Sequence, residues 1–147
     1  MSGYRYEIRG LVTQQTDEAG LITYENAARI QADGVEVELE TKRRSGLEAR
    51  VGYSFQNVRA EETEERLTNS PRHLLKVNAA APLLAERLSV ALSAQYASSR
   101  LTLQGGSASG HFLLHLVLHA RDLLPGVDAS AGVQNAFDES YADPGSQ

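Results

Sequence analysis

Alternation of apolar and polar residues is the feature of this sequence that most constrains its fold. Residues 47–56 (LEARVGYSFQ) place mostly apolar side chains at odd positions and polar side chains or glycine at even positions. Successive side chains of a β-strand point to opposite faces, so a period of two predicts a strand with one apolar and one polar face. The same pattern recurs in residues 35–40 and 88–98. The sequence therefore predicts a sheet whose two sides need different environments.

Strand patterns in seven segments predict an all-β fold, an antiparallel meander of about seven strands. These segments are residues 4–15, 21–42 (with a kink expected at Asp33-Gly34), 47–58, 73–81, 88–98, 111–121 and 127–134. Two stretches, 82–90 and 111–121, also fit a helix, because short apolar runs do not settle the period by themselves. The alternating neighbours favour strands, but strand and helix stay open there.

The predicted connections alternate in length along the chain. Short turns are expected at 43–46, 82–87 and 122–126, and long loops at 59–71 and 99–110. Residues 17–20 read as a further turn, because Asp and Gly favour turn conformations. Short turns at one end and long loops at the other are typical of a transmembrane β-barrel meander, which the fold class therefore includes.

Composition excludes several classes of function. At 147 residues, 41% of them apolar, the chain forms one domain, residues 1–147, and a net charge of −5 argues against nucleic acid as a partner. The absence of Cys excludes disulfides and thiol catalysis. No apolar run is long enough for a transmembrane helix, and the N-terminus lacks the apolar region of a secretory signal peptide.

No catalytic, metal or cofactor site is indicated by the candidate residues. On a helix His111, His115 and His119 could share a zinc ion, but on a strand neighbours in this series lie about 13 Å apart. Glutamates recur at 36, 38 and 40, which is typical of the wet face of one strand. The acidic stretch 61–65 and the glycines near 105 read as loops. We therefore expect no enzyme.

A membrane barrel would sort the alternating residues between lipid and lumen. The residues expected to face lipid are Leu47, Val51, Tyr53, Val90 and Leu92. The residues expected to face the lumen or a plug are Glu36, Glu38, Glu48, Arg50 and Gln95. Tyrosines mostly lie at or near strand ends, where they suit a membrane interface or ordinary strand propensity equally. The alternative is a soluble small β-barrel or curved sheet that binds a ligand on its apolar inner side.

Four short motifs lie in order along the chain. The first is Tyr24-Glu25-Asn26, and the second is the strand that contains Gly34, Val35 and Glu36 (GVEVELE). A central segment contains Asn69, Pro71 and His73, in the pattern Asn-x-Pro-x-His. Near the C-terminus, the pattern N-A-F-D-E-S-Y contains Asn135, Phe137, Asp138 and Tyr141, and Ala-Asp-Pro follows it.

Together these motifs resemble those of TonB-dependent outer-membrane receptors, with Ala136 where that family usually has Leu. The resemblance implies that residues 1–147 are a C-terminal part of a barrel of roughly 22 strands. Such receptors import iron–siderophore complexes, cobalamin or similar solutes across the outer membrane of Gram-negative bacteria. The implied partners are outer-membrane lipid, the receptor's own plug domain, its remaining strands and, through the parent receptor, TonB.

The same resemblance implies that important parts of the receptor lie outside this chain. The plug domain and TonB box would lie N-terminal to Met1, and the last, aromatic-ended strand would follow Gln147. An odd number of strands would also leave two open edges, which a bilayer does not tolerate. We therefore expect an incomplete receptor that is not competent for transport alone.

Overall fold

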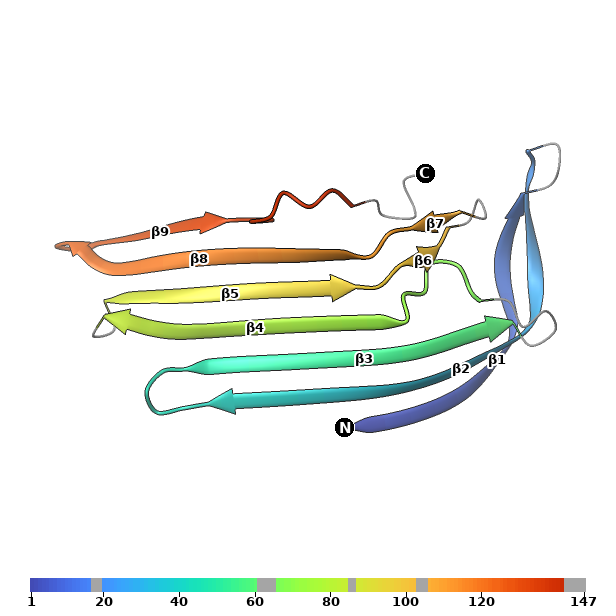
Figure 1. Ribbon diagram of the computed structural model, residues 1–147, viewed down its shortest axis with the longest axis horizontal. Coiled ribbons are helices and arrows are strands. Elements are labelled where there is room, and N and C mark those ends of the chain that lie inside the picture. Colours follow the sequence, from blue (N-terminus) through green and yellow to red (C-terminus); the bar gives the residue numbers. More distant parts are fainter. Residues whose placement is uncertain (17–19, 61–65, 85–86, 103–105, 142–147) are drawn as a thin grey trace.

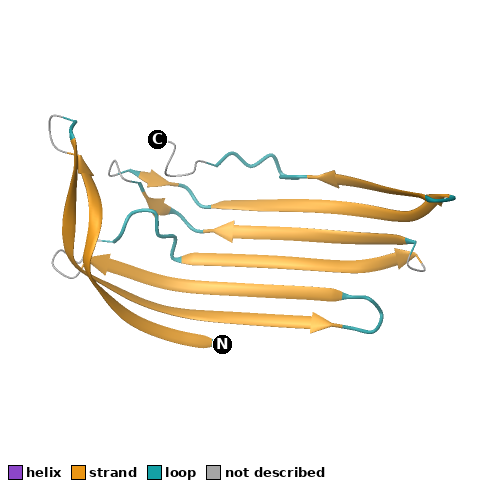
Figure 2. Ribbon diagram, turned by 180° about the vertical axis from the view of Figure 1, so that it is seen from behind, coloured by secondary structure: helices purple, strands orange, loops and turns teal. Residues whose placement is uncertain are grey.

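Strands are the regular elements of this chain. The computed structural model describes residues 1–16, 20–60, 66–84, 87–102 and 106–141, and Figure 2 shows strands and loops throughout them. The strands are β1 (Ser2–Thr16), β2 (Ile22–Lys42), β3 (Glu48–Ala60), β4 (His73–Leu84), β5 (Leu88–Ala97), β6 (Arg100–Leu101), β7 (Ser107–Ala108), β8 (His111–Leu124) and β9 (Val127–Val133). The all-β class is confirmed: residues 82–84 and 88–90 of one segment for which a helix stayed open belong to β4 and β5, and all of 111–121 belongs to β8.

No helix that could cross a bilayer is found in the described part of the chain.

Seven strands form one antiparallel sheet in the order β1-β2-β3-β4-β5-β8-β9. Figure 1 shows them side by side in a single layer, with the far ends of β1 and β2 turning away from the rest. The predicted meander is therefore confirmed. The edge strands β1 and β9 do not pair with each other, so the sheet is open in the described residues.

The two ends of the sheet differ in their connections, as the sequence predicts. The turn between β2 and β3 is tight: the Gly46 N–H donates to the Arg43 carbonyl at 3.0 Å, with Gly46 at φ 83°. This is the conformation that glycine adopts without steric cost. The β4–β5 and β8–β9 connections lie at the same end. The longer β3–β4 and β5–β8 connections lie at the other end, together with the short β1–β2 connection at 17–21, which does not follow the predicted sorting. Residues 17–19 and 61–65, in the turn and the acidic loop expected from the sequence, lie outside the described residues.

Several predicted boundaries are wrong. Residues 59–60 belong to β3 rather than to the long loop expected at 59–71. Residues 82–84 belong to β4 rather than to a connection, and 122–124 belong to β8 rather than to a turn. In both places the register shifts, so an irregularity lets strand pairing continue past residues that favour turns. The expected loop at 99–110 contains the small hairpin β6–β7. The expected kink at Asp33-Gly34 does not interrupt β2.

The sheet encloses almost no core. Among the described residues only Ile30, Ala32, Ala97 and Leu113 are buried apolar side chains. The accessible surface is 10610 Å² for a 16.0 kDa chain, whereas a compact monomer of that mass exposes roughly 7,400 Å². A single layer leaves its apolar face uncovered, so the fold depends on what surrounds it.

Close packing between β1 and β2 explains why the GVEVELE strand begins with glycine. Gly34 pairs with Tyr4 across the two strands, and the Tyr4 ring lies over it. A Cβ atom at position 34 would clash with that ring and would lie 2.8 Å from the Phe55 carbonyl oxygen. Gly52, on the same face of β3, has open space where a Cβ would lie.

We expect Gly34→Ala to destabilise the sheet and Gly52→Ala not to. The first substitution forces the Tyr4 ring or the backbone to move, which typically costs about 1–3 kcal/mol, whereas the second lowers the entropy of the unfolded chain. Urea unfolding of the refolded chain measures both. Equal changes for the two variants would contradict the packing, and adding Tyr4→Ala should restore only part of the loss in Gly34→Ala, because the contact with the Phe55 carbonyl oxygen remains.

Candidate functional site

One face of the central sheet is almost wholly apolar. Antiparallel register places directly paired residues on the same face, so rows of side chains run across the strands. One such row crosses β2, β3, β4, β5 and β8: Leu39, Val51, Val77, Ala94, Leu114. The next row towards the short turns continues the apolar character and reaches β9: Thr41, Ala49, Ala79, Leu92, Leu116, Val133. We call this surface the apolar face.

Large side chains on the apolar face remain exposed. Leu39 is 67% exposed and Leu118 is 44% exposed. Val51, Tyr53, Val90 and Leu92, four of the residues expected to face lipid, lie on this face. The fifth, Leu47, lies in the turn before β3, where its carbonyl accepts a hydrogen bond from the Arg43 N–H.

Aromatic side chains border the apolar face at the end of the sheet where the long connections lie. The Tyr53 hydroxyl shares a 2.8 Å hydrogen bond with Nδ1 of His73, and the Phe55 ring lies 5.2 Å from the His73 ring. Tyr96 and Phe112 are paired directly across β5 and β8. Aromatic rings therefore extend over β3, β4, β5 and β8, and we call this set the aromatic row.

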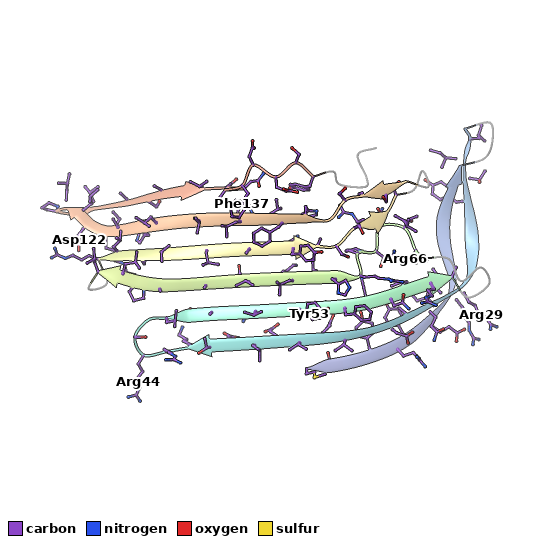
Figure 3. The ribbon with its side chains drawn as sticks, in the orientation of Figure 1. Arg29, Arg44, Tyr53, Arg66, Asp122 and Phe137 are labelled. Carbon is purple, nitrogen blue, oxygen red and sulfur yellow. The ribbon has the colours of Figure 1, made fainter. Side chains whose placement is uncertain are left out.

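Phe137, labelled in Figure 3, lengthens the aromatic row. Its ring lies 5.9 Å from the ring of Phe112. Aromatic girdles of this kind border the apolar band of outer-membrane barrels. An aromatic ring with a polar group at its edge suits the boundary between hydrocarbon and water.

The opposite face is polar. Register places Glu36, Glu38, Glu48, Arg50 and Gln95 together on it. An Arg50 nitrogen lies 2.9 Å from a Glu40 carboxylate oxygen, and another lies 3.7 Å from Glu38. We call this surface the polar face.

Shallow hollows in the sheet lie mainly on the polar face. One of about 520 Å³ includes Glu40, Glu48, Arg50 and His115 in its lining, and one of about 450 Å³ includes Glu36 and Glu38. A third, of about 570 Å³, lies near the long connections and is lined in part by Gln95, Arg100, His111 and Tyr141.

The three histidines of β8 are spread along the polar face. Their partners across the sheet are Ala97, Ser93 and Ser89. His111 is buried and stacks on Tyr141 with ring centroids 4.7 Å apart, while Nδ1 of His115 accepts a hydrogen bond from the Asn135 N–H at 3.3 Å. The helical zinc site is therefore excluded. Within the described ranges no group of three His, Cys, Asp or Glu side chains is placed to hold a metal ion.

The Asn-x-Pro-x-His motif ties the β3–β4 connection to the sheet. Nε2 of Gln56 donates to the Pro71 carbonyl at 3.0 Å, and the Asn69 N–H donates to the Leu101 carbonyl of β6 at 2.8 Å. Asn69 adopts φ 58°, a left-handed conformation that Asn tolerates better than most residues. His73 then begins β4 beside the aromatic row.

The C-terminal motif forms a compact turn after β9. The Asn135 side chain accepts from the Glu139 N–H and donates to the Glu139 carbonyl, both at 3.0 Å. Phe137 then contacts the apolar-face residue Phe112, and Tyr141 contacts the polar-face residue His111. The motif residues Asn135, Phe137 and Tyr141 thus have definite structural roles. Asp138 has φ 52° and donates its N–H to the Asn135 carbonyl at 2.9 Å. Residues 142–144 lie outside the described residues.

A group of arginines beyond the aromatic row was missed by sequence reasoning. Arg5, Arg29 and Arg59 share the side of the apolar face, but lie on the extensions of β1, β2 and β3. There a hydrogen bond from Arg9, with the charges of Arg9 and Arg29, lowers the pKa of the Glu7 carboxyl below its usual value. The sequence does contain a signal for these arginines. Each occupies a position that the two-residue alternation assigns to the side of the apolar face, beyond the aromatic residues.

Comparison with known proteins gives structural matches only. No family profile and no curated protein sequence matches the chain. The pyoverdine outer membrane receptor FpvA from Pseudomonas aeruginosa PAO1 matches with a TM-score of 0.73 and 16% identity, over 95% of this chain and 23% of that one. The FrpB iron transporter from Neisseria meningitidis matches with a TM-score of 0.62 and 15% identity, over 95% of this chain and 24% of that one.

A complex of FpvAI with pyocin S2 matches with a TM-score of 0.72 and 17% identity, over 97% of this chain and 23% of that one. The chain thus spans about a quarter of the length of the proteins that it matches. It has the fold of one part of the β-barrel of an outer-membrane receptor.

Proposed function

We propose that this chain forms part of the wall of an outer-membrane receptor barrel. Its apolar face contacts lipid, and its polar face lines the lumen or contacts a plug. The observation that carries the proposal is the arrangement on the two faces: an apolar surface ended by the aromatic row on one side, and charged hollows on the other. On this proposal Glu36, Glu38, Glu48, Arg50 and Gln95 face the lumen.

The height of the apolar face supports this assignment. From Phe112 to Ala120, β8 rises about 26 Å along its length, which is about 20 Å of height at a strand tilt of roughly 40°. Outer-membrane barrels have an apolar band about 25 Å tall. Within the central sheet, no charged residue interrupts the apolar face between the aromatic row and the short turns in the described strands.

The parent receptor would import an iron–siderophore complex or a similar solute. Support comes from the solved structures of similar fold, which are a pyoverdine receptor and an iron transporter, and from the motifs that resemble TonB-dependent receptors. Residues 1–147 would form one partial barrel domain, with β1 and β9 pairing with further strands. The long connections would lie outside the cell and help select the solute, and TonB would supply the energy through the parent.

The soluble alternative has no supporting observation. A soluble ligand-binding sheet would enclose its apolar residues, whereas here the hollows lie on the polar face and Leu39, Leu116 and Leu118 are exposed.

The same charge placed at two neighbouring positions, one on each face, tests the assignment of the faces. We expect Leu92→Arg to destabilise the chain folded into phosphatidylcholine vesicles by about 2–4 kcal/mol, because an arginine near the middle of the lipid-facing band must leave water. Ser93→Arg places the same group on the polar face and should cost little. Urea titration of vesicle-bound folded chain measures both. A cost for Ser93→Arg as large as that for Leu92→Arg would contradict the assignment.

The DNA that flanks the coding sequence tests whether this chain is part of a receptor. We expect the adjoining sequence to encode, in the same frame, a plug domain and further alternating strands upstream, and a last strand with an aromatic end downstream. Sequencing both flanks provides the measurement. Flanks that encode neither would contradict the proposal of a receptor, while leaving the membrane assignment of the two faces to be judged from the arginine variants.

A further inference from the structure

Three rows of polar side chains continue the apolar face beyond the aromatic row. The first contains Arg5, Asp33 and Asn57, the second contains Glu7, Gln31, Arg59 and Arg66, and the third contains Arg9 and Arg29. We call these the arginine rows. Arg29 and Arg66 are labelled near this end of the sheet in Figure 3, and Arg44 is labelled at the opposite end.

Arginines outnumber carboxylates in these rows. Asp33 pairs with Arg5, and Glu7 lies 2.8 Å from Arg9 and 3.6 Å from Arg29. Nη2 of Arg72 also reaches the rows, where it donates to Oδ1 of Asn57 at 3.3 Å. Six arginines therefore meet two carboxylates among the described residues, on a chain whose net charge is −5.

Arg59 and Arg66 form the least compensated part of the rows. They are paired directly across an isolated bridge, and like charges in that position repel each other. In the described part of the chain neither forms an ion pair with a carboxylate, and Arg59 donates only to the amide oxygen of Asn57 at 3.4 Å. A bound anion between or beside them would relieve the repulsion.

The height of the arginine rows matches the headgroup region of a bilayer. Successive rows are two residues apart, about 7 Å along a strand and about 5 Å in height at a tilt of roughly 40°. The first row lies one step beyond Phe55 and His73. If the aromatic row marks the edge of the hydrocarbon, the nearest arginines lie where lipid phosphates lie.

We propose that the arginine rows bind the phosphate groups of lipids in the outer leaflet. The guanidinium group matches phosphate geometry with two parallel hydrogen bonds, and basic groups beside a membrane attract anionic headgroups. This inference rests on the proposed insertion of the sheet into the outer membrane. The partner is a phosphate-bearing lipid at the outer end of the barrel, separate from any solute in the lumen.

Vesicle flotation with and without diphosphoryl lipid A tests the proposal. The full chain is refolded with vesicles of phosphatidylcholine alone and of phosphatidylcholine mixed with diphosphoryl lipid A. The test variant is Arg59→Gln/Arg66→Gln, and the matched control is Arg43→Gln/Arg44→Gln, which removes the same charge from exposed arginines at the short-turn end. We expect lipid A to strengthen vesicle binding of the wild type and of the control variant. For the test variant, the increase in binding caused by lipid A should be smaller by about tenfold or more.

Every outcome either supports or overturns the proposed binding of lipid phosphate groups. Equal binding of all three proteins to phosphatidylcholine, with the lipid A gain lost only in the test variant, supports the proposal. No gain from lipid A, an equal loss in both variants, or a test variant that binds like the wild type would overturn it. Failure of every protein to bind either vesicle would instead overturn the proposed membrane insertion, and this inference with it.

Discussion

Backbone hydrogen bonding between neighbouring strands is the interaction on which the rest of this structure depends. Each central strand pairs along its length with two neighbours, so its N–H and C=O groups need no water. The same pairing sets the register, and the register decides which side chains share a face. A shift of one residue would move Val51 to the polar face and Arg50 to the apolar face. Continuous pairing thus both permits and defines a surface suited to lipid.

Much of this fold could be predicted because the alternation within each strand shows which of its residues lie on the same face. The alternation in β3 and β5, and the sorting of short and long connections, are local properties of the sequence. The ends of β4 and β8 were missed, because an irregularity lets pairing continue past Pro82 and Asp122. Such continuation depends on the neighbouring strand and leaves no local signal. The hairpin β6–β7 was missed for a similar reason, since two-residue strands have no measurable period.

The functional surfaces were predictable in composition but not in arrangement. The sequence places Glu36, Glu38, Glu48, Arg50 and Gln95 at polar positions of their strands. Only register shows that they form one surface with shared hollows. The aromatic row likewise joins residues from separate strands, and its extension by Phe137 depends on the turn that Asn135 stabilises. The arginine rows become visible only when β1, β2 and β3 are aligned beyond that aromatic row.

The central claim is that one face of the sheet contacts lipid and the other contacts water. Because the natural chain has no Cys, single cysteines at Val77 and Asn78 can each be labelled with one fluorophore after the chain is folded into phosphatidylcholine vesicles. These neighbours lie on opposite faces of β4. Brominated lipid should quench the label at position 77, and aqueous iodide should quench the label at position 78. Quenching of the label at 77 by iodide and not by brominated lipid would contradict the account.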